Sequence, residues 1–263
     1  MSALSADQIR QISDELHRAR IEVRAIEPLK ARIPDLDIAG AYAISQQLLE
    51  RRLANGERIV GHKIGVTSHA VMQMLGVNQP DYGTLTDRMA YDDGSAILAS
   101  SMIAPRAEGE FAFILKRDLV GPGITPHQVL AATEAIAVCF EVVDSRIADW
   151  KITIEDTVAD NASAAAFVLG KNLISPRGFD LTTCGMVLEK NGEIVATGAG
   201  AAALRSPLNC VAWLANRLGQ FGTPLRAGEI ILSGALVPLL PVSAGDHIRV
   251  RVGGLGSAEM SFS

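Results

Sequence analysis

The chain has 263 residues, of which 48% are hydrophobic and 20% charged, and its formal net charge is −5 at pH 7. This composition excludes a disordered chain and suits one large domain with a small appendage. There is no basic run and no long uninterrupted apolar stretch, so the sequence predicts neither a nucleic-acid partner nor a membrane span.

Two helices are predicted at the start of the chain. The first begins after Ser5, because Ser5 and Gln8 have the spacing of a capping box and apolar residues then recur at helical spacing. The second begins near Asp37 and ends at Asn55-Gly56. Its inward-facing residues are expected to be Ala41, Ile44, Leu48 and Leu53.

From residue 58 the pattern changes to short apolar runs separated by glycine and proline. Strands are expected in RIVGHKIGVT, IAPRAEGEFAFIL, IAVCFEVVD, EIILSGAL, HIRVRV and AEMSFS, with a hairpin at MVLEKNGEIVATG. QPDYGTL is predicted to be a loop, and helices are expected at AVMQMLGV and after Thr125-Pro126 and Ser206-Pro207. Strands and helices do not alternate regularly. We therefore predict an α+β fold with a mixed, curled sheet: an N-terminal helical region at 1–57 and a β-rich catalytic domain at 58–263.

Two glutamates interrupt the apolar strand PRAEGEFAFIL. Glu108 and Glu110 are two residues apart and therefore point to the same face, roughly 6.5 Å apart along the strand. Carboxylates that share one space repel each other, and a divalent cation such as Mg²⁺ or Mn²⁺ removes that cost. The alternative is a solvated outer face of an edge strand.

A second acidic pair, Glu141 and Asp144, lies in and after the apolar strand CFEVVD. A buried acid needs a partner, so Glu141 is the expected third ligand of the same ion and Asp144 the reserve candidate. The alternative is a salt bridge from either acid to Arg146.

Other polar residues are candidates for binding and catalysis. Lys63 in GHKIGVTS could bind a carboxylate or act as an acid, or it could be an ordinary surface lysine. Asp81 lies in a stretch bounded by Pro80 and Gly83, where either function or simple turn chemistry is expected. Ser233 and Gly234 could form an anion cradle. The cysteines Cys139, Cys184 and Cys210 have no metal-ligand spacing, which predicts buried thiols in a reducing compartment.

Several long stretches resemble one known family over nearly the whole chain: GHKIGVTS, QPDYGTLTDRM, PRAEGEFAFIL, FEVVDSRIADWKITIEDTVADNAS, LEKNGEIVATGAGAAAL and EIILSGALVPL. They are similar to the hydratase/decarboxylase family of aromatic meta-cleavage pathways, within the fumarylacetoacetate-hydrolase-like superfamily. The resemblance implies a mixed β-roll core and a Mg²⁺ or Mn²⁺ ion held by Glu108, Glu110 and Glu141. It also places Lys63 and Asp81 in the pocket as a catalytic pair, with Ser163 lining it.

The implied activity is hydration of 2-hydroxypenta-2,4-dienoate to 4-hydroxy-2-oxopentanoate. The alternatives are 4-oxalocrotonate decarboxylase activity, for which Arg146 or Arg106 could bind a second carboxylate, hydration of a longer 2-hydroxydienoate, and a non-catalytic assembly partner. The resemblance further implies a cytoplasmic homo-oligomer that can associate with the decarboxylase. Two departures are expected to matter. Ala164-Ala165 replaces a frequent Cys-Gly and could reshape the pocket, and Arg205 replaces a frequent glycine.

Overall fold

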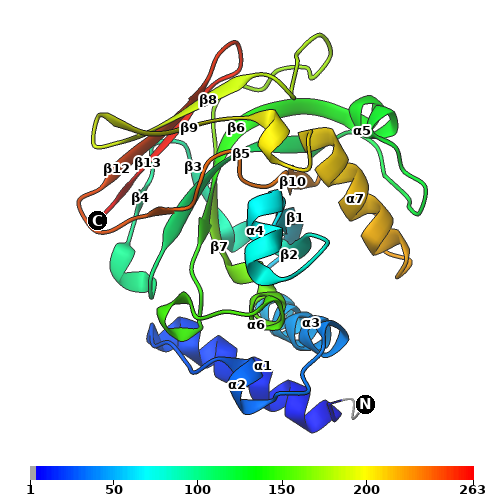
Figure 1. The fold of residues 1–263 in the computed structure, drawn as a ribbon, viewed down its shortest axis with the longest axis vertical. Helices are drawn as coiled ribbons and strands as arrows, with labels where there is room; N and C mark the ends of the chain where they lie inside the picture. The colour runs from blue at the N-terminus through cyan, green and yellow to red at the C-terminus, as the bar shows by residue number, and fades with distance from the viewer. Residues whose placement is uncertain (1–3) are drawn as a thin grey trace.

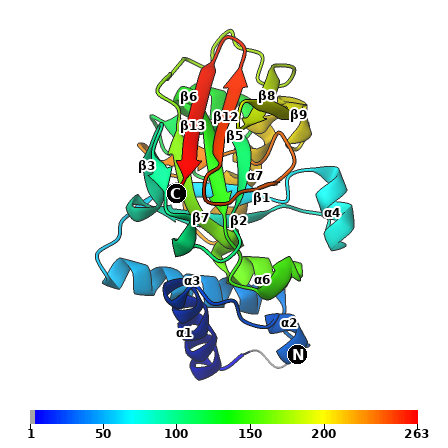
Figure 2. The same ribbon diagram turned by 90° about the vertical axis from the view of Figure 1, so that its left-hand side faces the viewer.

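The computed structural model describes residues 4–263, so residues 1–3 of the predicted helical region lie outside the described residues. Three helices open the chain and lie together at one end of the molecule in Figures 1 and 2: α1 (Ala6–Glu22), α2 (Leu29–Arg32) and α3 (Ile38–Ala54). As predicted, Ser5 and Gln8 form a capping box at the start of α1, and the Asp37 side chain caps α3. None of the helices between residues 4 and 263 has the length and apolar content needed to cross a bilayer.

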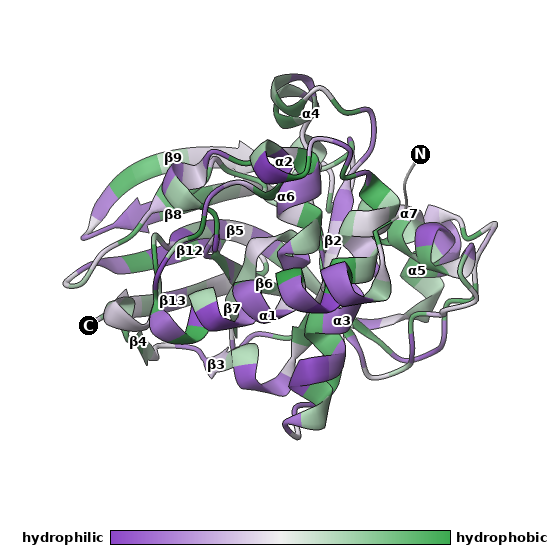
Figure 3. Ribbon diagram, turned by 90° about the horizontal axis from the view of Figure 1, so that it is seen from below, coloured by the Kyte–Doolittle hydropathy of each residue, from purple (hydrophilic) through white to green (hydrophobic). Residues whose placement is uncertain are grey.

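The N-terminal helices bury one face each, and hydrophilic and hydrophobic residues alternate along α1 and α3 in Figure 3. Of the four residues expected to face inward on α3, Ala41, Ile44 and Leu48 are buried, but Leu53 is 36% exposed and its neighbour Arg52 is buried instead. The apolar cluster of these helices also includes Val158 and Ala159 of α6 (Ile154–Ala159), from the second half of the chain. The division of the chain between residues 57 and 58 stays a prediction.

The larger sheet has eight strands and both parallel and antiparallel pairs, as the predicted mixed sheet requires. The strand order is β2-β1-β10-β5-β6-β7-β3, and β11 pairs with β5. The bounds are β1 (Ile59–Gly65), β2 (Asp81–Thr86), β3 (Ala90–Asp92), β5 (Arg106–Leu115), β6 (Thr133–Val143), β7 (Ala164–Leu169), β10 (Ile230–Leu232) and β11 (Leu240–Pro241).

A second sheet of five strands packs on the first and closes the main core (Figure 1). Its order is β4-β13-β12-β8-β9. The bounds are β4 (Ala96–Ile97), β8 (Gly185–Lys190), β9 (Glu193–Ala199), β12 (His247–Val252) and β13 (Gly256–Phe262). Phe111 and Phe140 of the larger sheet meet Ile248 and Val250 of the smaller one in this core. The β8–β9 hairpin turns at Asn191-Gly192 as predicted, with both residues at positive φ.

The remaining helices lie between or beside the sheets: α4 (His69–Leu75), α5 (Pro126–Ala132) and α7 (Pro207–Gly219), with single turns at Asp87–Met89, Ala99–Ser101, Ala148–Trp150, Asn161–Ser163 and Gly200–Ala202. Thr125 and Gln128 form a capping box at α5. Ser206 occupies the cap position of α7, but its side chain makes no capping hydrogen bond.

The stretch QPDYGTL is not a loop, because Asp81 begins strand β2, which pairs antiparallel with β1. Gly83 suggested a turn, but its reason is close packing: a Cβ at Gly83 would lie 2.5 Å from the carbonyl oxygen of Asn161. A glycine demanded by a close approach cannot be distinguished in the sequence from a turn glycine.

Arg205 adopts a left-handed backbone conformation, with a φ of 67°, and is exposed directly before the cap residue of α7. This conformation costs a residue with a Cβ about 1–2 kcal/mol, and a cation at a helix N-terminus is also unfavourable. The glycine that relatives often carry here would avoid both costs.

We predict that Arg205→Gly raises the free energy of unfolding by about 1 kcal/mol, because it relieves the left-handed strain. Chemical denaturation followed by circular dichroism measures the change. Arg205→Ala is the matched control, since it removes the charge but keeps the Cβ. Equal gains from both variants would show that the charge, not the backbone, causes the effect.

Candidate active site

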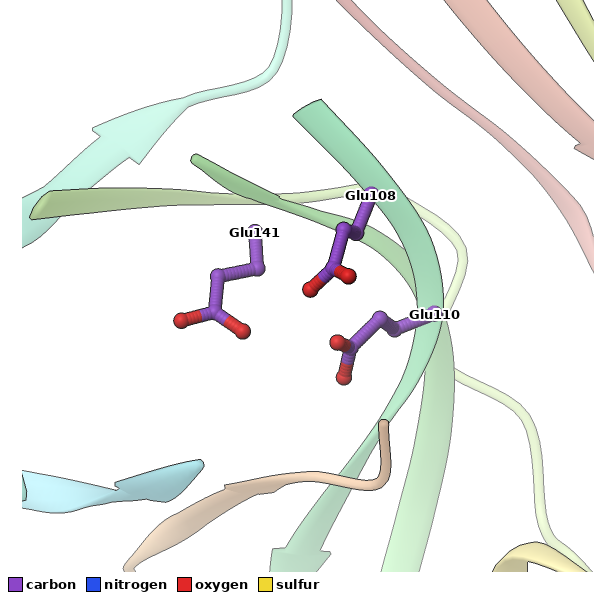
Figure 4. Close-up of side chains that lie close together, drawn as sticks. All are labelled: Glu108, Glu110 and Glu141. Carbon is purple, nitrogen blue, oxygen red and sulfur yellow. The ribbon is translucent and has the colours of Figure 1, made fainter. Parts of the chain in front are cut away.

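The pairing of β5 with β6 brings three carboxylates together. Glu108 and Glu110 share one face of β5, and Glu141 of β6 lies directly opposite Glu108 in the antiparallel register. Figure 4 shows the three carboxylates reaching into one space. One oxygen from each lies within 4.8 Å of the others. Glu141 therefore joins the pair as predicted, while the solvated edge strand is excluded because β5 lies inside the sheet.

Burial makes this cluster electrostatically costly. Glu110 and Glu141 are completely buried and Glu108 is 8% exposed. Desolvation, reinforced by the neighbouring carboxylates, raises the pKa of Glu110 well above its usual range. It also raises the pKa of Glu141 to about 8 and that of Glu108 above its ordinary value. These groups favour a proton or a cation over their bare charge.

The donor set fits a divalent cation. Within residues 4–263, Oε1 of Glu110 and Oε2 of Glu141 are buried without a hydrogen-bond donor, and Oε1 of Glu141 faces the Lys63 ammonium at 3.2 Å. The other Glu110 oxygen accepts a hydrogen bond from the Gly234 N–H at 2.7 Å, which fixes the orientation of that carboxylate. Three converging carboxylates suit Mg²⁺, which binds oxygen ligands and keeps several waters.

Lys63 lies beside the carboxylates and is not a surface lysine, being only 3% exposed. Its Nζ is 3.2 Å from Glu141 Oε1 and donates a hydrogen bond to the Ala162 carbonyl at 2.9 Å. Burial alone would lower the pKa of Lys63, but the surrounding carboxylates, Glu141 first, raise it above its usual value. Lys63 is therefore a charged ammonium held at the rim of the acidic cluster.

Asp81 is the next polar group beyond Lys63. Both side chains lie against the bare face of Gly65, where a Cβ would be 2.3 Å from Asp81 Oδ1 and 3.2 Å from Lys63 Nζ. Asp81 is 1% exposed, and burial raises the pKa of its carboxyl group although the Lys63 charge opposes the shift. A buried acid beside a buried ammonium is an arrangement suited to proton transfer.

The predicted binding residues Ser163, Ser233 and Gly234 separate into two kinds. The Ser163 and Ser233 hydroxyls are buried and have no hydrogen-bond partner within the described chain. Gly234 offers no free N–H, because that group already donates to Glu110.

These residues form a row across the larger sheet. Asp81 comes from β2, Lys63 from β1, Ser233 follows β10, the glutamates come from β5 and β6, and Ser163 precedes β7, which is the order of the strands in the sheet. The same face continues into a small apolar cluster that includes Ala112 and Cys139, which explains why the carboxylates are desolvated.

An unusual turn supports one side of the row. Asn161, Ala162 and Ser163 all have positive φ, between 50° and 57°. Asn161 exchanges two hydrogen bonds with the Thr84 backbone, and the Ala162 carbonyl accepts from Lys63. Left-handed residues in sequence are costly, so surrounding contacts must hold this turn in place.

A buried ion pair provides that support, and sequence reasoning did not identify it. Arg146 Nε lies 2.5 Å from Asp160 Oδ1, and its Nη2 donates to the Asp160 carbonyl at 2.7 Å. The alternative of a salt bridge from Asp144 or Glu141 to Arg146 is wrong, because the Arg146 side chain donates to the Asp144 carbonyl oxygen and to neither carboxylate. Arg146 and Asp160 are fourteen residues apart and share no helix or strand, so no local periodicity indicates the pair.

The structure also shows where two other candidates lie: Asp144, the reserve metal ligand, and Arg106, a candidate for binding a second carboxylate. The Asp144 carboxylate accepts hydrogen bonds from the Ile103 and Ala104 N–H groups and is absent from the acidic cluster found in residues 4–263, so the reserve ligand was wrong. The Arg106 guanidinium stacks on the Trp150 ring at 4.4 Å.

Comparison with known proteins assigns the chain to a family and supports the fold. The model of the fumarylacetoacetate (FAA) hydrolase C-terminal family matches residues 59–263. The chain belongs to the fumarylacetoacetate hydrolase family. A solved structure of 4-oxalocrotonate decarboxylase from Pseudomonas putida G7, complexed with magnesium and adipate, superposes with a TM-score of 0.97 at 38% identity and covers 100% of both chains. The predicted β-roll fold is therefore confirmed.

Two curated members of the family are still more similar in sequence. A 2-hydroxypent-2,4-dienoate hydratase of Pseudomonas putida is 61% identical over 215 residues, which are 81% of this chain and 97% of the relative. A 2-hydroxyhexa-2,4-dienoate hydratase of Comamonas testosteroni is 51% identical and covers 94% of this chain and 95% of its own length.

We predict that Mg²⁺ stabilises the protein more strongly as pH rises. Without the ion, the raised pKa values mean that the folded chain holds protons which the unfolded chain has released. Stability is therefore lost as pH rises from about 4.3, the pKa of a glutamate in the unfolded chain, through about 8, the pKa of Glu141 in the folded chain. The ion binds the ionised carboxylates and restores that stability.

Thermal unfolding with and without saturating Mg²⁺ across this range measures the effect. Glu110→Gln should abolish the Mg²⁺-induced shift in Tm, whereas the matched control Glu193→Gln, at an exposed position on β9, should keep it. A shift that is constant with pH, or that survives in Glu110→Gln, would contradict a site at these carboxylates.

Proposed function

We propose that this chain is a metal-dependent hydro-lyase that converts 2-hydroxypenta-2,4-dienoate to 4-hydroxy-2-oxopentanoate in the meta-cleavage degradation of aromatic compounds. The observation that carries the proposal is the row of buried, unpartnered polar groups around the three carboxylates. The names of the relatives at 61% and 51% identity support hydration as the reaction.

The proposed metal ligands are Glu108, Glu110 and Glu141, and the proposed ion is Mg²⁺ or Mn²⁺. A structural relative at 38% identity was solved with magnesium, which supports a divalent cation. When bound, the ion supplies a Lewis acid for the oxygen at C2 of the substrate. By holding the ion, the three carboxylates would determine where the anionic substrate head, its carboxylate and C2 oxygen, can bind.

Lys63 and Asp81 are the proposed acid/base pair. Lys63 contacts Glu141 and Asp81 lies beyond it, so a substrate with its head at the carboxylates would have C2 and C3 nearest Lys63 and C4 and C5 nearest Asp81. Net hydration requires protons at C5 and C3 and removal of one proton each from the C2 hydroxyl and from water, which adds at C4. We assign the exchanges at C4 and C5 to Asp81, whose raised pKa lets it hold a proton. Lys63 is assigned the donation to C3, and it regains a proton from the C2 hydroxyl.

Ser163 and Ser233 are proposed to bind the substrate, because their buried hydroxyls would otherwise be left unsatisfied. Gly234 is proposed to act by orienting Glu110 through its N–H. Decarboxylation of a dicarboxylate is less favoured, because Arg146 is committed to Asp160 and Arg106 to Trp150. A non-catalytic assembly partner would have no reason to keep this set of unsatisfied groups buried.

The proposal extends to the setting of the enzyme. We infer a cytoplasmic homo-oligomer that can associate with 4-oxalocrotonate decarboxylase, from the family resemblance. The three cysteines, all free thiols, support a reducing compartment.

We predict that the purified protein hydrates freshly generated 2-hydroxypenta-2,4-dienoate in the presence of Mg²⁺. Loss of the dienoate ultraviolet absorbance and a product mass increased by one water measure the reaction. EDTA should abolish turnover and added Mg²⁺ should restore it. Release of CO₂ from 4-oxalocrotonate without hydration of the dienoate would instead identify a decarboxylase.

We predict that Lys63→Met and Asp81→Asn each lower kcat by about 10²- to 10⁴-fold, the range typical of a lost general acid or base. Steady-state kinetics measure kcat, and the Mg²⁺-induced shift in Tm verifies that the metal site is retained. Lys151→Met and Asp149→Asn are matched controls, because that ion pair is 73% exposed on both sides. Near-normal turnover in both site variants would refute the assignment.

A further inference from the structure

A cavity of about 410 Å³ opens next to Asp81. Its walls come from α3, residues 76–81, α6 and α7. Cavities of about 300–1,000 Å³ hold drug-sized ligands, so this space exceeds what the end of a five-carbon acid requires. The three glutamates do not line it, and the substrate head would therefore lie outside it.

The cavity lies in line with the catalytic row. Glu141 contacts Lys63, Lys63 and Asp81 lie against the same face of Gly65, and Asp81 lines the cavity. A substrate whose head is held by the carboxylates and whose C4 and C5 lie at Asp81 would direct any substituent on C5 into this space.

The walls are mainly apolar. They include Ile38 and Tyr42 of α3, Val77 and Pro80 of the loop before β2, and Ile154 and Val158 of α6. The Tyr42 ring is stacked on Tyr82 at 4.6 Å, and burial raises the pKa of its hydroxyl, which stays neutral. Such a lining gains free energy by covering hydrocarbon.

The charged groups at the cavity favour a neutral substituent over an acidic one. Among the described lining residues Arg217 is the one cation, and its Nη1 donates to Gln220 Oε1 at 3.0 Å while the guanidinium stacks on Phe221 at 5.2 Å. Asp81 also lines the cavity, so a second carboxylate there would lie close to a buried acid. Ala164 and Ala165, expected to reshape the pocket, are not among the lining residues.

We propose that this cavity binds an apolar substituent on C5, so that the enzyme hydrates 2-hydroxydienoates longer than five carbons at least as well as the five-carbon acid. The inference rests on the proposed hydratase function. Each methylene buried in the cavity is worth about 0.8 kcal/mol, or about fourfold in kcat/KM.

The test compares kcat/KM of the full-length Mg²⁺-loaded protein for four substrates: 2-hydroxypenta-, 2-hydroxyhexa- and 2-hydroxyhepta-2,4-dienoate, and the dicarboxylate 2-hydroxyhexa-2,4-dienedioate. We expect values for the six- and seven-carbon monoacids to equal or exceed that for the five-carbon acid, and a value at least tenfold lower for the dicarboxylate.

Two variants locate the effect in the cavity. Val77→Phe and Ile38→Phe fill it from two different segments, the loop before β2 and α3, and each should lower the ratio of the seven-carbon to the five-carbon kcat/KM by at least tenfold. Ile194→Phe is the matched control, since Ile194 is 62% exposed on β9, and it should leave the ratio unchanged.

The outcomes separate this inference from the proposed function. Turnover of the five-carbon acid alone would overturn the inference and leave the hydratase intact. Preference for the dicarboxylate would also overturn it, by showing that Arg217 anchors a second carboxylate. An unchanged ratio of the seven-carbon to the five-carbon kcat/KM in both cavity variants would also overturn the inference, by showing that the substituent binds outside this cavity. Hydration of none of the four would overturn the proposed function itself.

Discussion

Repulsion among three buried carboxylates is the constraint on which the rest of the site depends. Glu108, Glu110 and Glu141 with the Lys63 ammonium leave a formal charge of −2, from three negative groups and one positive, in a space with little water. A divalent cation balances that charge. The Gly234 N–H orients the Glu110 carboxylate toward such an ion. The adjoining apolar cluster excludes water, so the electrostatic attraction between the carboxylates and the ion is not screened.

The sequence was sufficient to predict the features that depend on residues close together in the chain. The capping boxes at Ser5 and Thr125, the hairpin turn at Asn191-Gly192 and the acidic face of β5 all depend on residues a few positions apart. The third carboxylate could be proposed because an acid inside an apolar strand needs a partner. The roles of Lys63 and Asp81 came from family resemblance and stay a proposal, although their burial beside the cluster is what such roles require.

Long-range contacts account for what the sequence could not give. Gly83 looks like a turn residue because nothing near it in sequence reveals that the Asn161 backbone presses against it. Likewise, the partner of Arg146 is Asp160, which directly precedes a turn of three left-handed residues. The identities of those residues, Asn, Ala and Ser, did not require such a turn. Arg52 replaces Leu53 as the buried residue of α3 because it pairs with Glu57, an acid beyond the end of the helix.

The strand order has a consequence for how the protein is made. Strand β10, at residues 230–232, lies between β1 and β5, which end at residues 65 and 115. During vectorial synthesis on the ribosome, β1–β2 and β5–β6–β7 are therefore made long before the strand that joins them. Until then each presents an open edge that can pair with another chain. The nascent polypeptide therefore exposes these edges during most of its synthesis. The row of proposed site residues is completed only when translation is nearly finished.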